Sequence, residues 1–397
     1  MSTAAQQVSA MQAPTMREVS GLADQLIDAA ALALWPGARL QGAAHVPSVT
    51  SYIRRLVVND TVVYAKAILG MPLASLLRGA AGSWPDVQEA QRVYVRNHGS
   101  LLEREAGQLA VLHRGRHPQV ARLMGYHDGV LFTQAMPGLP LSEVLLHSPQ
   151  DTARLLAGVM GGLDGLQRQA TSRLVIGSSI EERGIDGAFQ RKFAGASAAG
   201  YMASLAEVWP AETMVLRAAV DRLRANDRRG GGLATMTSRV VYGYLTPEHV
   251  LYPGRPGAEP VYLTPGLMRD TPLADPARLL SRSVLTLLAA RPGRAVTECV
   301  AQGLAVFCQQ QAARFPGVQG QALRALLRLW AMDTVTIMST YLSAPADLPL
   351  PGHARALLPR AGCALDIAHQ VAAAVSAHRA PEPALLSALA AVVEAAS

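Results

Sequence analysis

The sequence predicts an α+β protein with a small β-rich N-terminal lobe and a large helical C-terminal lobe. Strand-like runs and one strong helix occur before residue 136, whereas apolar residues at helical spacing dominate afterwards. One pair of short β-like runs, within residues 240–266, interrupts the helical part. We therefore expect a disordered tail over residues 1–15, an N-lobe over 16–135 and a C-lobe over 136–397.

The N-lobe shows two changes of hydrophobic period. A helical period at its start gives way to a period of two near Ser51, which is typical of strands. The expected elements are a helix over 16–35, strands over 52–58 and 62–64 joined at Asn59-Asp60, helical stretches over 72–82 and 84–96 that form an insertion at 70–98, a helix over 100–112, and a hairpin over 125–134 that turns at Asp128-Gly129.

The C-lobe is predicted to be helical except for its β-like pair. The apolar, alanine-rich tail over residues 383–397 is too short to cross a membrane and is typical of an amphipathic docking helix. The expected elements are a helix from about Ser142, helices over 153–167, 211–225, 277–290, 295–313 and 321–342, and β-like runs over 240–252 and 260–264.

Composition excludes several classes of protein. Half of the 397 residues are hydrophobic, which suffices for a sizeable core. The net charge of +7 is modest, and no dense Lys/Arg run with interleaved aromatics predicts a nucleic-acid partner. No apolar run reaches the ~18–20 residues of a membrane span, and no secretory signal is visible. The 3 cysteines show no metal spacing, so we expect a cytoplasmic protein without a membrane partner.

Two charged residues stand out in the N-lobe. Lys66, one of only two lysines, lies in the strand-like run Val62-Val-Tyr-Ala-Lys-Ala-Ile, where it faces away from its neighbours. Glu105 lies on the strong helix, ahead of an Ala-x-x-Leu face, and Glu103 is its competitor. The alternative for Lys66 is an ordinary solvated lysine on a strand.

Two further stretches follow in the chain. The first is Gly125-Tyr-His-Asp-Gly-Val-Leu-Phe-Thr-Gln-Ala-Met-Pro-Gly-Leu-Pro-Leu. The second is Val241-Tyr-Gly-Tyr-Leu-Thr-Pro-Glu-His-Val-Leu-Tyr, followed by Val261-Tyr-Leu-Thr-Pro-Gly-Leu.

These stretches, in this order, resemble the aminoglycoside phosphotransferases over residues 51–290. That family has a bilobal protein-kinase-like fold and uses ATP and Mg²⁺. The resemblance implies that Lys66 orients the nucleotide phosphates and that Glu105 holds the lysine. It also implies that the backbone around Thr133 and Met136 binds adenine.

The second stretch departs from the family pattern, His-Gly-Asp-Leu-x-x-x-Asn-x-Leu and then Asp-Pro-Gly. Tyr244 replaces the catalytic aspartate, and Thr264 replaces the Mg²⁺-binding aspartate. His249 takes the asparagine position, and Asp275 resembles the aspartate that braces the loop. A phenol keeps its proton at neutral pH, and a neutral hydroxyl is a poor Mg²⁺ ligand.

Neighbouring residues offer a partial substitute for the missing carboxylates. Asp270, six residues past Thr264, can supply a metal ligand if the loop lets it swing back. His249 offers a nitrogen, which suits Mg²⁺ poorly. Residues 41–51 hold a single glycine where the family's phosphate loop has more, so the binding of ATP and Mg²⁺ is left open.

A basic cluster in the C-lobe is the other candidate site. Arg183, Arg191 and Lys192 lie close together in sequence and are flanked by Phe189 and Phe193. Such a cluster can dock an acidic or phosphorylated peptide. The alternative is a solvated, basic loop.

The whole pattern favours a pseudokinase, a degenerate phosphotransferase homologue that binds a peptide or protein partner. It is similar to actinobacterial phosphotransferase-like proteins that accompany ribosomal peptide natural products, such as class V lanthipeptides and thioamitides. That similarity implies a precursor peptide and a separate lyase as partners in Ser/Thr dehydration, in a homo- or hetero-oligomer. The alternatives are an active ATP-dependent phosphotransferase acting on peptide Ser/Thr or a small hydroxylated metabolite, and a structural protein unrelated to kinases.

Overall fold

A computed structural model describes residues 13–115, 118–167, 169–227, 237–254 and 259–397. It divides into two compact units. The sheet unit comprises Met1–Ala106, Leu123–Ala135 and Ala344–Pro351, and the helical unit comprises Gly107–Arg122, Met136–Ser343 and Gly352–Ser397. The tail expected to be disordered over residues 1–15 lies, up to residue 12, outside the described residues.

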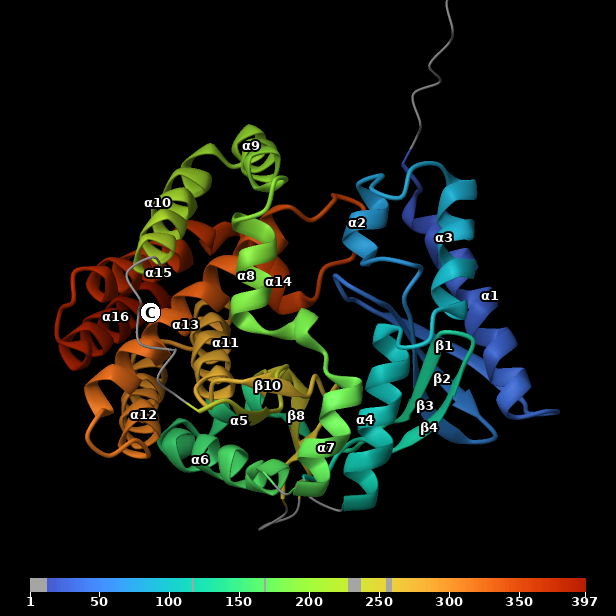
Figure 1. The fold of residues 1–397 in the computed structure, drawn as a ribbon, viewed down its shortest axis with the longest axis horizontal. Coiled ribbons are helices and arrows are strands. Elements are labelled where there is room, and N and C mark those ends of the chain that lie inside the picture. Colours follow the sequence, from blue (N-terminus) through green and yellow to red (C-terminus); the bar gives the residue numbers. More distant parts are fainter. Residues whose placement is uncertain (1–12, 116–117, 168, 228–236, 255–258) are drawn as a thin grey trace, which may run out of the picture. The chain divides into compact units, whose positions relative to one another are not determined.

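The sheet unit is built on one antiparallel sheet of five strands in the order β1-β2-β3-β5-β4 (Figure 1). Its elements are α1 (Met16–Leu34), β1 (Leu40–Val46), β2 (Tyr52–Val58), β3 (Thr61–Ala67), α2 (Leu73–Leu77), α3 (Trp84–Arg96), the start of α4 (Leu101–Gly115), β4 (Leu123–His127) and β5 (Val130–Gln134).

Both predicted hairpins are confirmed, and their turns explain why. Asn59 and Asp60 have φ angles of 47° and 66°, and Asp128 and Gly129 have 45° and 77°. Two consecutive residues with positive φ match the right-handed twist of the flanking strands, and Asn, Asp and Gly tolerate that conformation best. The turn residues thereby set the strand register that fixes the position of Lys66, opposite Ile53 on β2 and Leu131 on β5.

The helical unit holds most of the remaining chain. Its elements are the rest of α4, β6 (Leu139–Pro140), α5 (Leu141–His147), α6 (Thr152–Gly162), α7 (Gln169–Ser178), α8 (Ile185–Phe193), α9 (Ala198–Val208), α10 (Pro210–Asp227), β7 (Arg239–Val241), β8 (Val250–Tyr252), β9 (Val261–Tyr262), β10 (Met268–Asp270), α11 (Ala274–Ala290), α12 (Arg294–Ala313), α13 (Gln319–Leu342), α14 (Gly352–Leu357), α15 (Ala361–Ser376) and α16 (Pro381–Ala396).

The continuous β-like run expected over residues 240–252 is wrong. The chain leaves β7 at Val241, makes a turn and a short 3₁₀ helix over Pro247–His249, and enters β8 at Val250. Two residues interrupt the run. Gly243 has φ +78°, which a strand does not adopt, and Pro247 has no backbone N–H to donate to a neighbouring strand. β7 pairs with β10, whereas β8 lies between β6 and β9, so the loop between β7 and β8 joins two small sheets.

Two expected helices are shorter than their apolar patterns. The helix expected over residues 153–167 stops at Gly162, and a 3₁₀ helix over Asp164–Gln167 follows. The hydroxyl of Tyr262 would meet a Cβ at Gly162, so the helix approaches β9 closely there. The helix expected over 72–82 covers only Leu73–Leu77, because Gly79 and Gly82 have positive φ angles and end the helical path.

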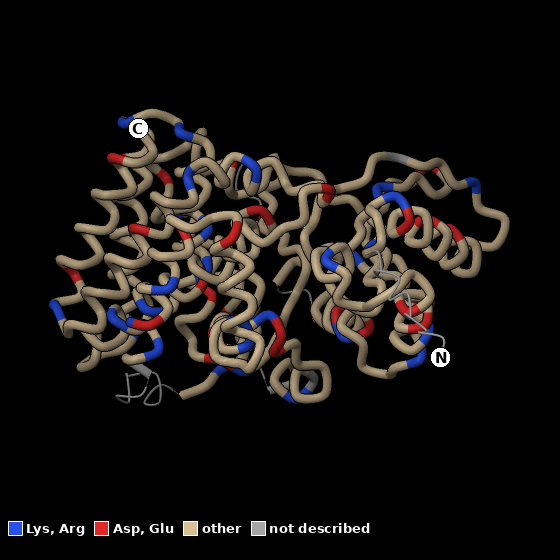
Figure 2. The backbone as a smooth tube through the Cα atoms, turned by 90° about the horizontal axis from the view of Figure 1, so that it is seen from above, with Lys and Arg blue, Asp and Glu red and all other residues tan. Residues whose placement is uncertain are grey.

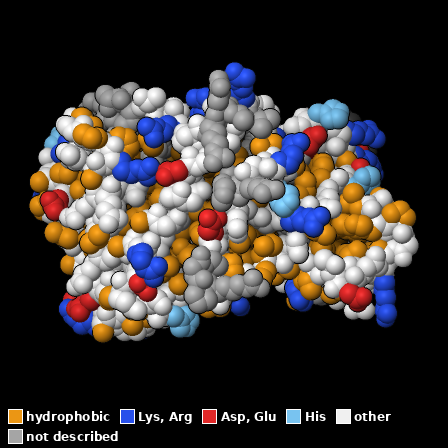
Figure 3. Space-filling view, turned by 90° about the horizontal axis from the view of Figure 1, so that it is seen from below, with side chains coloured by type: hydrophobic (Ala, Val, Ile, Leu, Met, Phe, Trp, Pro, Cys, Tyr) orange, Lys and Arg blue, Asp and Glu red, His pale blue; other side chains and the backbone are white. Residues whose placement is uncertain are grey.

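Charge is dispersed along the chain. Figure 2 shows acidic and basic residues scattered over both units, and on the face in Figure 3 both kinds lie among apolar side chains. Among the described residues, no helix has the length and the apolar character needed to span a membrane.

Candidate functional site

The sheet unit brings Lys66 and Glu105 together. The Lys66 ammonium donates to both carboxylate oxygens of Glu105, at 3.1 and 2.9 Å. The Lys66 side chain is 14% exposed and that of Glu105 only 2%. Glu103, the competing residue, is more exposed and accepts from the backbone N–H of Gly99 at 2.6 Å. The strand lysine therefore pairs with Glu105, and its role toward a nucleotide stays a prediction.

The predicted adenine-binding residues follow this strand region. Thr133 lies on β5, opposite Tyr64 of β3 and Leu123 of β4. Met136 follows the end of the sheet unit at Ala135 and is half-buried. Their part in adenine binding stays a prediction.

In the helical unit, Asp275 braces the loop that follows β7. Its two carboxylate oxygens accept from the backbone N–H groups of Tyr242 and Gly243, at 2.6 and 2.8 Å. Burial raises the pKa of Asp275 to about 6, although these hydrogen bonds favour the charged form. Gly243 has φ +78°, and an added Cβ would lie 2.1 Å from the carbonyl oxygen of Gly266, so only glycine fits there.

A second brace comes from Gln108 on α4, which sequence reasoning missed. Its amide oxygen accepts from the backbone N–H of Leu267 at 2.8 Å, and its amide nitrogen donates to the Leu267 carbonyl at 3.0 Å. The backbone N–H of Gly266 donates to the Tyr242 carbonyl at 3.0 Å. Gly266 is thus bonded to the loop that follows β7, and Leu267 is bonded to α4.

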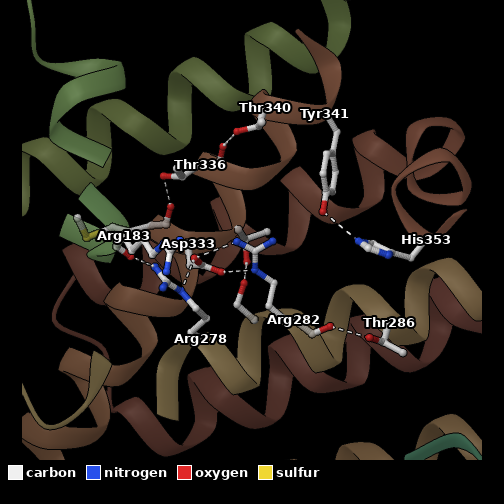
Figure 4. A network of polar contacts seen from close by, with 12 residues as sticks. Arg183, Arg278, Arg282, Thr286, Asp333, Thr336, Thr340, Tyr341 and His353 are labelled. Carbon is white, nitrogen blue, oxygen red and sulfur yellow. Dashed lines mark hydrogen bonds and ion pairs between the residues drawn. The ribbon is translucent and has the colours of Figure 1, made fainter. Parts of the chain in front are cut away.

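Beneath the loop lies a buried ionic cluster, shown in Figure 4. Asp333 of α13 accepts from Arg278 at 3.3 Å and from Arg282 at 2.7 Å. Arg278 also donates to the carbonyls of Gly243 and Arg183. Burial alone would raise the pKa of Asp333, but the two guanidinium groups hold it below its usual value.

Tyr244, which the sequence resemblance aligns with the catalytic aspartate, lies close to two guanidinium groups. The Cζ atoms of Arg183 and Arg278 are 5.2 and 5.6 Å from the centre of its ring, and the His249 ring is 5.0 Å away. This is cation–π geometry, which stabilises an uncharged ring beside cations. At Tyr244, an aromatic ring therefore interacts with the guanidinium groups of Arg183 and Arg278, where the family has a carboxylate.

Thr264, which the sequence resemblance aligns with the metal-binding aspartate, has a φ angle of +52°. A β-branched residue is strained there, whereas Asp, Asn and Gly tolerate the left-handed region. The backbone at this position therefore suits an aspartate better than the threonine that occupies it.

We expect Thr264→Gly to raise the free energy of unfolding by about 1 kcal/mol, because the left-handed strain disappears. Urea denaturation followed by intrinsic fluorescence measures the change. Thr246→Gly is the control: this threonine of the loop between β7 and β8 has φ −118°, so glycine should destabilise the protein there. An equal loss of stability in both variants would rule out strain at Thr264.

The structure places Asp270 on β10, opposite Arg239, while Met268 of the same strand lies opposite Val241. The part of Asp270 as a metal ligand stays a prediction. Burial raises the pKa of Asp270. Thr264 and His249 offer one hydroxyl and one imidazole, which do not fit Mg²⁺. Over the described ranges, no group of three or more His, Cys, Asp or Glu side chains forms a metal-holding arrangement.

The three predicted docking cations have three different sets of partners. Arg183 donates to the Pro265 carbonyl at 2.5 Å, and Arg191 donates to the Glu182 carbonyl at 2.5 Å. Lys192 donates to the Thr336 carbonyl at 2.9 Å and to two hydroxyl groups of α13. Each cation bonds to another segment of the helical unit, and peptide docking by them stays a prediction.

The arrangement within each unit now identifies the fold. One unit is an antiparallel sheet with a strand lysine paired to a helix glutamate. The other is helical and carries a loop between short strands that a later helix braces through Asp275. The fold is protein-kinase-like.

Comparisons with solved structures return kinases and phosphotransferases. Choline kinase from Cryptosporidium parvum Iowa II has a TM-score of 0.48 at 10% identity, covering 87% of this chain and 94% of that one. Spectinomycin phosphotransferase in complex with ADP and spectinomycin has 0.45 at 9%, covering 89% and 98%. Ethanolamine kinase from Plasmodium vivax has 0.43 at 9%, covering 81% of each chain. No family model and no curated protein matches the sequence.

Proposed function

We propose that this protein is a pseudokinase, a catalytically degenerate phosphotransferase homologue that binds a peptide or protein partner. The observation that carries the proposal is the contact of the Tyr244 ring with Arg183 and Arg278, in a loop that Asp275 braces. Phosphoryl transfer needs a group that accepts or guides the hydroxyl proton, and a phenol held against two cations is a poor one.

The replacement of a metal-binding carboxylate also argues against phosphoryl transfer. Thr264 brings no charge to the position where the family binds Mg²⁺, and Asp270 is held on β10. Losing charge neutralisation and hydroxyl positioning together raises the transition-state barrier by several kcal/mol, or on the order of thousands-fold in rate. A loop that is held in place without these groups is better suited to holding a ligand than to transferring phosphate.

We further propose the partner implied by the sequence resemblance: a precursor peptide, processed together with a separate lyase during Ser/Thr dehydration. A bound hydroxyl-bearing peptide is compatible with a kinase-like fold that no longer reacts. The second candidate is an active ATP-dependent phosphotransferase acting on peptide Ser/Thr or on a small hydroxylated metabolite. The intact Lys66–Glu105 pair favours it, because this pair orients nucleotide phosphates in active relatives of the fold.

An ATP-turnover assay separates the two candidates. We expect the wild type to show no turnover near the ~1–100 s⁻¹ of ordinary kinases. The variant Tyr244→Asp/Thr264→Asp places a carboxylate at each of the two positions, and a gain of activity in this variant alone would identify a degenerate site. The same variant with Lys66→Ala should lose that gain. Wild-type turnover at an ordinary kinase rate would contradict the pseudokinase proposal.

A further inference from the structure

One short segment leaves the helical unit and later returns to it. Ala344–Pro351 belongs to the sheet unit, whereas the chain before it, up to Ser343, and the chain after it, from Gly352, belong to the helical unit. The segment joins the end of α13 to the start of α14. We call it the strap. At each of its ends the chain passes from one unit to the other.

Inside the sheet unit, the strap is anchored by apolar side chains and by one helix end. Leu348 and Leu350 are only 4% and 7% exposed. The carboxylate of Asp347 accepts from the backbone N–H of Met16, the first residue of α1, at 3.3 Å. A negative charge is favourable at a helix N-terminus. Because Asp347 is exposed, the two buried leucines contribute most of the anchoring.

The composition of the strap makes it stiff. Three of its eight residues are prolines, Pro345, Pro349 and Pro351. The backbone N–H of Leu348 donates to the Pro345 carbonyl at 3.1 Å, which fixes a turn within the strap. Since proline restricts its φ angle to one narrow range, such a segment is a semi-rigid spacer rather than a flexible linker.

A contact inside the helical unit closes the base of the strap, as Figure 4 shows. The hydroxyl oxygen of Tyr341, near the end of α13, lies 3.1 Å from Nε2 of His353, near the start of α14. The two rings meet edge to face, with their centres 6.1 Å apart. Burial raises the pKa of Tyr341 and lowers the pKa of His353, so both groups are uncharged at neutral pH and the phenol donates to the imidazole. We call this contact the clasp, because it holds the two ends of the strap together.

We propose that the strap couples the two units, so that neither unfolds or moves independently of the other. Kinases close around their ligands by hinge movement between two lobes. A stiff segment that is anchored in one unit and closed at its base in the other opposes such a movement. This inference is independent of the pseudokinase proposal, since it holds whether or not the loop after β7 transfers phosphate.

Differential scanning calorimetry of the full chain tests the coupling. The wild type should unfold in a single transition. Leu348→Ala/Leu350→Ala removes the apolar anchors and should split the transition in two, with the sheet unit melting at least about 5 °C below the helical unit. Leu385→Ala/Leu389→Ala is the matched control, since these leucines of α16 are 0% and 3% exposed. The control should lower the melting temperature but keep one transition.

Hydrogen exchange measured by mass spectrometry assigns the transitions to the units. In Leu348→Ala/Leu350→Ala, peptides from β2 and β3 should exchange about tenfold faster or more, whereas peptides from α12 should not change. Tyr341→Phe removes only the hydroxyl of the clasp, and it should speed exchange in peptides that cover the strap while α12 again stays unchanged.

Three results would overturn the proposal. The first is a wild type that already unfolds in two transitions. The second is a Leu348→Ala/Leu350→Ala variant that keeps a single transition, as the control does. The third is exchange in the strap that Tyr341→Phe leaves at the wild-type rate.

Discussion

Asp333→Ala is expected to destabilise the helical unit by about 3–5 kcal/mol, because it leaves two buried guanidinium groups without their carboxylate. Arg278 and Arg282 are 5% and 13% exposed, and Asp333 is 3% exposed, so water cannot replace the lost partner. Urea denaturation reports the loss through Trp330, which is 1% exposed on the same helix, α13.

Two further variants serve as controls for Asp333→Ala. Asp151→Ala removes an exposed pair with Arg154 at 3.0 Å and should cost no more than about 1 kcal/mol. Arg282→Met in the Asp333→Ala background should recover part of the loss, because one stranded charge is removed. An Asp333→Ala variant as stable as Asp151→Ala would contradict the predicted effect.

The same cluster has a defined pH dependence. The guanidinium groups hold the pKa of Asp333 below its usual value, so its contribution is fully present above about pH 4 and is lost as pH falls through the lowered pKa. The stability difference between wild type and Asp333→Ala should therefore shrink in acid and stay level above that pH.

The second large effect is expected at Asp275. Asp275→Ala leaves the buried N–H groups of Tyr242 and Gly243 without acceptors, which should cost about 2–5 kcal/mol in total. Asp275→Asn keeps one acceptor oxygen, so its free energy of unfolding should fall by less than that of Asp275→Ala. Equilibrium denaturation in urea measures both, and an Ala variant no less stable than the Asn variant would show that the backbone groups find other partners.

The pH dependence at Asp275 has the opposite sign from that at Asp333. Burial raises the folded-state pKa of Asp275 to about 6. The protonated form is therefore favoured by folding, and its contribution is full below about pH 4 and is lost as pH rises through about 6. The difference between wild type and Asp275→Asn should change over this window and remain constant at higher pH.

Local sequence signals were sufficient for the hairpins and for the catalytic-loop pattern. The turns at Asn59-Asp60 and Asp128-Gly129 were predicted because their residues tolerate positive φ, which is a property of single residues. The Lys66–Glu105 contact was predicted from a motif on each partner, even though the pair is 39 residues apart in sequence. The fold class was predictable for the same reason, since each motif marks one element.

No local sequence motif predicted the buried ionic cluster of Arg278, Arg282 and Asp333. Arg278 and Asp333 are 55 residues apart, and in a chain whose basic residues are nearly all arginine no single arginine stands out. The stacking of Tyr244 depends on Arg183, which comes from a segment before the loop. The pairing of Asp270 with Arg239 on β7 had no signal in the sequence either. These contacts depend on tertiary packing, which periodicity does not encode.

We propose that the site keeps its bracing by Asp275 but binds no Mg²⁺, and the effect of Mg²⁺ on nucleotide-induced stabilisation tests this proposal most directly. A bound ligand raises the melting temperature in proportion to its occupancy of the folded state. For the wild type, we predict the same melting temperature in ATP with and without Mg²⁺, whereas Thr264→Asp should gain a Mg²⁺-dependent increase. A Mg²⁺-dependent rise of several degrees in the wild type, matching that of the variant, would contradict the account.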